Sequence, residues 1–166
     1  MADKRSAGIL VFRRTNGQVE VLIGHMGGPL WARRDANAWS IPKGEPDPDE
    51  TLESAAHREF QEELGLPVPD GELIDLGSVK QSNGKVVTVW ALEGDLDPDR
   101  VAPGTFQMEW PKGSGVLREF PEIDRVAWFD LATARAKLVK AQQEFLDRLA
   151  QSLKITVRGE PPGRRS

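Results

Sequence analysis

The amino-acid sequence predicts a single α/β domain in which helices flank a mixed β-sheet. Its 166 residues suffice for one hydrophobic core but are too few to suggest two domains. Two turn sequences, Asn16-Gly17 and Asn83-Gly84, each separate apolar runs and predict antiparallel hairpins. Helical segments alternate with these strand-like runs, and this order of elements is typical of a sheet covered by helices.

The composition is that of a folded protein whose surface is not basic. Apolar residues make up 39% and charged residues 29% of the chain. The net charge of -4 argues against a surface that binds a nucleic acid polymer. Because the chain has no cysteine, a metal site would need oxygen ligands or the two histidines, which have no ligand-like spacing partner.

No targeting or membrane segment is predicted. The apolar run at residues 7–12 is too short for a signal peptide. No stretch reaches the roughly 20 apolar residues that cross a bilayer. We therefore expect a cytoplasmic protein without membrane contact, and no sequence pattern specifies an oligomeric state.

The first predicted elements form a hairpin followed by a loop. Strands are expected at residues 6–13 and 19–23, joined by the turn at residues 15–17. Residues 24–37 are rich in glycine and basic residues and predict a loop. Residues 39–42 predict a short strand that ends at the following prolines.

A central helix has recognisable start and stop signals. Asp47 is the predicted N-cap, Pro48 the first helical residue, and Glu50 the third, which completes a capping box. Gly65 suits a left-handed C-terminal position, and Pro67 prevents continuation of the helix.

The second half predicts four strands, two helices and a tail. The strands are expected at residues 73–80, 86–92, 106–110 and 125–129, with a loop at residues 93–104, and the helices at residues 131–138 and 142–153. Residues 1–158 would form the domain, and residues 159–166, rich in proline and arginine, a flexible C-terminal tail.

Three carboxylates share one face of the central helix. Glu59, Glu62 and Glu63 stand at i, i+3 and i+4, and they continue the apolar stripe that contains Leu52 and Ala55. A stripe of this kind faces the protein body, where clustered carboxylates repel one another unless a cation neutralises them. Oxygen ligands suit Mg²⁺ or Mn²⁺, which also bind phosphates.

These residues lie within a longer motif: Gly44, five residues, Glu50, seven residues, and then Arg58-Glu59-Phe60-Gln61-Glu62-Glu63-Leu64-Gly65-Leu66. The motif resembles the Nudix box of MutT-like hydrolases. All nine specified positions within its 23 residues are filled.

The resemblance implies an α/β/α sandwich, a loop-helix-loop catalytic motif, and hydrolysis of a nucleoside diphosphate linked to another group. It also implies that Glu59, Glu62 and Glu63 bind the divalent metal, together with the backbone carbonyl of Lys43. Glu59, Glu63 and a downstream carboxylate are candidates for the group that takes the proton.

Other residues of the motif receive structural roles. We expect Gly44 to allow a tight turn, Glu50 to cap the helix, Arg58 to brace it through Glu62 at i+4, and Gly65 to end it.

The family resemblance also implies a carboxylate supplied from a downstream loop. Glu119 is the first candidate, with Glu109 and Glu122 as alternatives.

Residues that would bind the substrate are chosen by their chemistry. Candidates for contact with phosphates are Lys43, Lys80, Lys85, Arg33 and Arg34. Candidates for stacking on a base are Trp31, Trp39 and Trp110, whereas Trp39, Trp90 and Trp128 are also predicted in the core.

The segment Trp39-Ser40-Ile41-Pro42-Lys43-Gly44 resembles bacterial dinucleoside polyphosphate hydrolases of this family, and residues 27–33 and 106–129 also resemble bacterial members. Those enzymes carry a tyrosine after the box, and this chain has no tyrosine. An ADP-ribose hydrolase would have proline near the position of Gln81. The alternatives are a MutT-like pyrophosphohydrolase of oxidised nucleoside triphosphates and a nucleotide-sensing module without turnover.

Overall fold

A computed structural model describes residues 4–154, and its central feature is a mixed sheet. The sheet order is β3-β2-β1-β6-β5, with β9 also paired to β2 and β4 to β1. Its strands are β1 (Arg5–Thr15), β2 (Gln18–Met26), β3 (Trp39–Ser40), β4 (Lys43–Gly44), β5 (Ile74–Lys80), β6 (Val86–Glu93) and β9 (Ile123–Asp130). β1 and β6 are parallel and the other pairs are antiparallel, which confirms the predicted mixed sheet.

Both predicted hairpins are present. The turn between β1 and β2 places Asn16 and Gly17 at φ values of 53° and 78°, a pair of left-handed residues that suits the twist of a hairpin. In the second hairpin the backbone of Gln81 pairs with Lys85, and Gly84 has a φ of 88°. Lys85 therefore lies directly before β6, beside the end of β5 that carries Lys80.

The strands β1 and β2 separate, and the segment with β3 and β4 lies between them. Their pairing is limited to residues 12–15 and 18–21, whereas Gly8 pairs with Lys43 and Gly24 with Ser40. A Cβ atom at Gly8 would lie 2.5 Å from the carbonyl oxygen of Pro42, so glycine permits this close approach. This segment, residues 39–44, is called the inserted segment below, and it places Lys43 and Gly44 at one end of the sheet.

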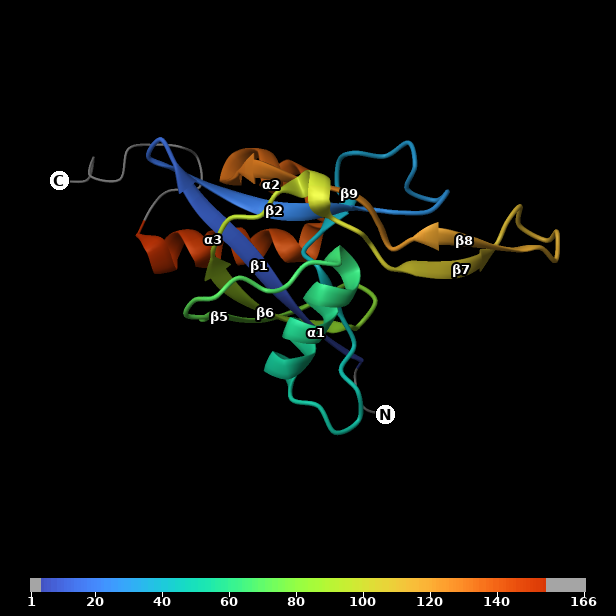
Figure 1. Cartoon of the computed structure of the whole chain (residues 1–166), viewed down its shortest axis with the longest axis horizontal. Coiled ribbons are helices and arrows are strands. Elements are labelled where there is room, and N and C mark those ends of the chain that lie inside the picture. The colour runs from blue at the N-terminus through green and yellow to red at the C-terminus, as the bar shows by residue number, and fades with distance from the viewer. Residues whose placement is uncertain (1–3, 155–166) are drawn as a thin grey trace.

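Helices cover both faces of the sheet (Figure 1). The helix α1 (Leu52–Leu64) buries Phe60 and Leu64 against one face, where it meets Ile9 and Val11 of β1. On the other face lie α2 (Leu131–Lys137), η2 (Lys140–Gln142) and α3 (Gln143–Leu153). Alternate residues of β1 thus enter two separate cores, as expected for a sheet that is buried on both sides.

The helix α1 begins later than predicted. Its N-cap is Thr51, whose hydroxyl accepts a hydrogen bond from the Ser54 backbone at 3.1 Å. The predicted cap, Asp47, instead forms a turn in which its N–H donates to the Glu50 side chain at 2.9 Å. The predicted end is correct, because Gly65 adopts a left-handed φ of 66° and its N–H donates to the Gln61 carbonyl.

Three other regions differ from the sequence-based expectation. The predicted loop at residues 24–37 begins later, because β2 continues to Met26. The strand β8 (Leu117–Pro121) was not predicted, and it pairs with β7 (Thr105–Glu109) in a two-stranded ribbon that projects from the body (Figure 1). The predicted loop at residues 93–104 contains the short helix η1 (Pro98–Arg100).

The predicted tail and the end of the predicted domain at residue 158 lie outside the described residues. Within residues 4–154, no helix has the length and apolar character needed to cross a bilayer.

Candidate functional site

The three helix carboxylates line one cavity of about 460 Å³, here called the acidic pocket. Its wall comes from β1, from α1, from the inserted segment, from the residue before β6 and from the end of the β7–β8 ribbon at which β7 begins and β8 ends. The lining residues are Ser6, Lys43, Gly44, Glu45, Glu59, Glu62, Glu63, Lys85, Gly104, Thr105 and Glu122. Five carboxylates and two ammonium groups thus share this cavity, which concentrates negative charge at one end of the sheet.

Arg58 connects the start of the motif to two of the helix carboxylates. Its guanidinium donates to both oxygens of Glu50, at 2.8 and 2.9 Å, and to Glu59 and Glu62 at 3.0 Å each. The expected i+4 pair with Glu62 is therefore present. The hydrogen bonds that Arg58 donates to Glu50 lower the pKa of Glu50 to about 2 and raise the pKa of Arg58 further above its usual range.

Glu63 lies deepest of the three and has no arginine partner among the described residues. Its Oε2 accepts a hydrogen bond from the Lys43 backbone N–H at 3.1 Å. Burial raises the pKa of Glu63 to about 8, and burial also raises the pKa of Glu59. The pKa of Lys43 is lowered, first by burial and then by the neighbouring Lys85 ammonium. Charged forms are disfavoured here because little water reaches them.

Gly44 has a different role from the expected tight turn. It belongs to β4 and is not among the described glycines with positive φ. A Cβ atom at this position would lie 2.1 Å from the carboxyl carbon of Glu59. Glycine is therefore needed because the Glu59 carboxyl group lies directly against the backbone of β4.

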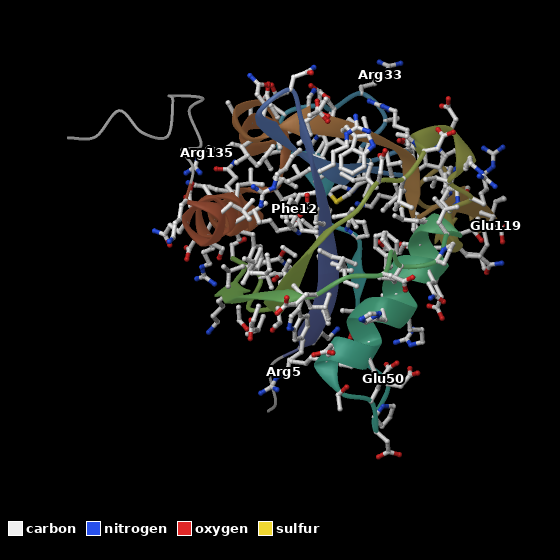
Figure 2. All side chains as sticks on the ribbon, turned by 60° about the vertical axis from the view of Figure 1, so that its left-hand side comes forward. Arg5, Phe12, Arg33, Glu50, Glu119 and Arg135 are labelled. Atoms are coloured by element: carbon white, nitrogen blue, oxygen red, sulfur yellow. The ribbon has the colours of Figure 1, made fainter. Side chains whose placement is uncertain are left out.

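The downstream carboxylate in the acidic pocket is Glu122, not Glu119. Glu119 is an exposed residue of β8, opposite Gln107, and Figure 2 shows it at the edge of the molecule. Glu122 follows β8, and its backbone pairs with Gly27 and Gly104. The third alternative, Glu109, accepts hydrogen bonds from the backbone of the turn between β7 and β8.

A second cavity, of about 710 Å³, adjoins the first and is here called the lysine pocket. Its lining residues are Met26, Trp31, Ser40, Lys43, Lys80, Gln81, Ser82, Asn83, Lys85, Val139, Lys140, Ala141 and Gln142. Four of these are lysines and none is acidic, in a chain whose acidic residues outnumber its lysines and arginines by 26 to 22. The structure thus brings together Trp31, Lys43, Lys80 and Lys85 from the predicted substrate-binding set.

Other predicted substrate contacts lie elsewhere. Arg33 is exposed in the loop after β2, and Figure 2 shows it at the opposite side of the molecule from Glu50. The Arg34 guanidinium lies 5.6 Å from the Trp31 ring centroid. Trp39 is only 2% exposed, and its indole N–H donates to Asp35, so it is a core residue.

Trp110 follows β7 at the outer end of the ribbon and is not among the described residues that line the two pockets. Trp90 and Trp128, predicted in the core, are partly buried against the cluster under α1.

Three pocket residues were not anticipated from the sequence. Lys140 and Gln142 belong to η2, about 100 residues from the inserted segment that they face. The Gln142 amide accepts from the Ile41 N–H at 2.8 Å and donates to the Ser40 hydroxyl at 3.1 Å. The buried Ser6 hydroxyl in the acidic pocket has no hydrogen-bond partner among the described residues. No local pattern marks any of these three residues.

The donor chemistry of the acidic pocket suits a hard divalent cation. Carboxylate oxygens are the ligands that Mg²⁺ and Mn²⁺ prefer. Within residues 4–154, however, no group of three His, Cys, Asp or Glu side chains converges on one point that would hold a metal ion. Glu59 and Glu62 are directed to Arg58, so both would have to exchange this partner for the cation.

Comparison with known proteins identifies the fold. A Caenorhabditis elegans Ap4A hydrolase has the same architecture, with a TM-score of 0.65 and 22% identity over 90% of this chain and 97% of that structure. The NUDIX domain of Shewanella oneidensis NrtR, crystallised with ADP ribose, aligns with a TM-score of 0.62 and 15% identity over 92% and 90% of the two chains. This chain is therefore an α/β/α sandwich with a carboxylate-bearing loop-helix-loop segment.

The family follows from the sequence comparison. The family model named NUDIX domain matches residues 3–149, so the chain belongs to the Nudix family. An RNA pyrophosphohydrolase of Pseudomonas putida is 46% identical over 55 residues, which are 32% of this chain and 35% of that protein. The match thus spans about a third of the length of this curated relative.

Proposed function

We propose that this protein is a metal-dependent hydrolase that cleaves a phosphoanhydride bond in a nucleoside diphosphate linked to another group. The acidic pocket carries this proposal, because Glu59 and Glu63 are partly buried in it and Arg58 pairs with Glu59 and Glu62 but not with Glu63. Divalent Mg²⁺, or Mn²⁺, held by Glu59, Glu62, Glu63 and the Lys43 carbonyl would neutralise the carboxylates, bind the diphosphate and activate water for attack.

The protein's own groups would then position the phosphates and accept the proton. Lys43 and Lys85 line the acidic pocket together with the carboxylates and would bind phosphate oxygens. Glu63, Glu59 and Glu122 are the candidates for the base, and Glu122 takes the place that sequence reasoning assigned to Glu119. A base must lie within hydrogen-bond reach of the attacking water, and each of these three side chains lines the pocket.

For the substrate, we propose a dinucleoside polyphosphate or a similar nucleotide with several phosphates. The adjoining lysine pocket supports this choice, because a phosphate chain that leaves the acidic pocket past Lys43 and Lys85 would enter it. Trp31, which is partly buried at this pocket, offers an aromatic face for a base in place of the missing tyrosine. We further propose that the substrate is a small nucleotide rather than a nucleic acid polymer and that the protein is cytoplasmic.

Three other functions remain as candidates. The relative from Pseudomonas putida, named an RNA pyrophosphohydrolase, favours RNA as a substrate. A MutT-like enzyme would release pyrophosphate from an oxidised deoxynucleoside triphosphate. A nucleotide-sensing module would bind nucleotide without turnover, although all carboxylates of the Nudix box are present in this chain.

A phosphate-release screen with Mg²⁺ and Mn²⁺ would test the proposal. The panel holds diadenosine tetraphosphate, ADP-ribose, NADH, coenzyme A, 8-oxo-dGTP and a 5′-triphosphorylated RNA oligonucleotide, compared by kcat/KM. We expect diadenosine tetraphosphate to be preferred. A tenfold advantage of ADP-ribose or 8-oxo-dGTP, about 1.4 kcal/mol in transition-state terms, would refute the substrate choice. Nucleotide binding with no product over hours would indicate a sensor.

A further inference from the structure

The lining residues show how the acidic pocket, the lysine pocket and a third groove follow one another along the surface. Lys43 and Lys85 line both the acidic pocket and the lysine pocket, so they lie at the boundary between them. Lys80 and Lys140 line the lysine pocket and the next surface groove, of about 520 Å³, but not the acidic pocket. Leaving the carboxylates, a ligand therefore meets first Lys43 and Lys85, and then Lys80 and Lys140.

The lysine pocket gathers positive charge, and its distal lysines, Lys80 and Lys140, lie away from the carboxylates with which Lys43 and Lys85 share the acidic pocket. Within residues 4–154, none of its four lysines has an ion pair with a carboxylate, whereas Lys137, three residues before Lys140, is paired with Asp35. The acidic side chains of the next groove are also engaged, because Glu144 pairs with Arg148 and Asp147 with Arg135. Like charges that gather around a cavity without counterions repel one another, and an anionic ligand would relieve this repulsion.

We propose that the lysine pocket is a second phosphate-binding site that selects for the length of the phosphate chain, with Lys140 and Lys80 as its distal residues. This inference rests on the proposed function. A diphosphate at the acidic pocket reaches only Lys43 and Lys85, whereas a chain of four phosphates extends to Lys80 and Lys140. The ligand class is thus a linear polyphosphate, free or esterified to nucleosides, and a substrate with a neutral sugar beyond its diphosphate leaves Lys140 without a partner.

Kinetics of Lys140→Gln would test the selection for length. Because a charge-assisted hydrogen bond to a phosphate is stronger than a neutral one, kcat/KM for diadenosine tetraphosphate should fall at least about tenfold more than kcat/KM for ADP-ribose. The matched control is Lys112→Gln, an exposed lysine in the turn of the β7–β8 ribbon, which should change neither value. Equal losses on both substrates, or no loss on either, would overturn the proposal.

A binding measurement separates this inference from the proposed hydrolysis. Inorganic tripolyphosphate would be titrated calorimetrically into the protein in EDTA, so that any binding observed does not depend on a metal. We expect binding that weakens about tenfold or more in Lys140→Gln, remains unchanged in Lys112→Gln, and is stronger than binding of orthophosphate. Such binding without any hydrolysis in the substrate screen would refute the enzyme but support the site. Hydrolysis of diadenosine tetraphosphate with no effect of Lys140→Gln on this binding would refute the site but not the enzyme.

Discussion

The raised pKa of Glu63 predicts a specific change of stability with pH. In metal-free protein, burial raises the pKa of this carboxyl group from 4.5 to about 8. The folded state therefore holds the proton more tightly than the unfolded state. The resulting stabilisation is complete below pH 4.5 and is lost as the pH rises through about 8.

The size of the effect follows from the shift. At 1.36 kcal/mol per unit, the change from 4.5 to about 8 sets an upper limit of about 5 kcal/mol. For a protein of this length, 1 kcal/mol corresponds to about 2–4 °C in Tm, so the limit is about 10–20 °C. Glu63→Gln mimics the protonated carboxyl group, and its amide oxygen can still accept the hydrogen bond from the Lys43 N–H.

The assay is the difference in Tm between Glu63→Gln and the wild type, measured in EDTA from pH 4.5 to pH 9. We expect a difference near zero at pH 4.5 that grows in favour of the variant toward pH 9. Glu53→Gln, at an exposed position of the same helix, is the control for the loss of one carboxylate and should not reproduce this pH dependence. A Glu63→Gln variant that is less stable than the wild type at pH 9, or a flat difference curve, would refute the burial argument.

Three further predictions concern activity. Excess EDTA should abolish hydrolysis and added Mg²⁺ should restore it, because carboxylates cannot hold a polyphosphate without a cation. Undiminished turnover in chelator would contradict the mechanism. Glu122→Gln should lower kcat by about tenfold or more, whereas Glu119→Gln should have little effect, because of these two residues only Glu122 lines the acidic pocket. Both are measured by phosphate release. A larger loss in Glu119→Gln would identify Glu119 as the functional carboxylate. Gly44→Ala should reduce kcat/KM more than about tenfold, because the added methyl group would displace the Glu59 carboxyl group. An unchanged kcat/KM would show that Glu59 can move without loss of activity.

Sequence reasoning succeeded where the cause is local. The hairpin turns depend on adjacent residues such as Asn16 and Gly17, and the shared face of Glu59, Glu62 and Glu63 depends only on the helical repeat. Membership of the Nudix family was also predictable, because the box is a contiguous motif, and the family match confirms it.

The sequence-based expectation and the structure differ where contacts outside the local segment decide between alternatives. Asp47 and Thr51 both have side chains that can cap a helix. Thr51 is the cap because Arg58 of the helix itself holds Glu50 in the turn before the helix, a contact that capping preferences do not include. Glu119 was preferred to Glu122 because nothing in the sequence shows that residues 117–121 form a strand with β7.

The lysine pocket could be predicted only in part for the same reason. Lys80 and Lys85 belong to one hairpin, whereas Lys140 comes from η2, and only the folded chain brings them together.

The side chain of Gln142 joins the last part of the fold to the segment that precedes the Nudix box. The Gln142 side chain is 1% exposed, and its amide oxygen accepts a hydrogen bond from the Ile41 N–H, as a neighbouring strand would. Ile41 lies two residues before Lys43. Changes to η2 that are meant to alter substrate preference at Lys140 would therefore shift Lys43, which borders both cavities. Specificity and turnover would then vary together across engineered variants of η2, unless the amide at position 142 is retained.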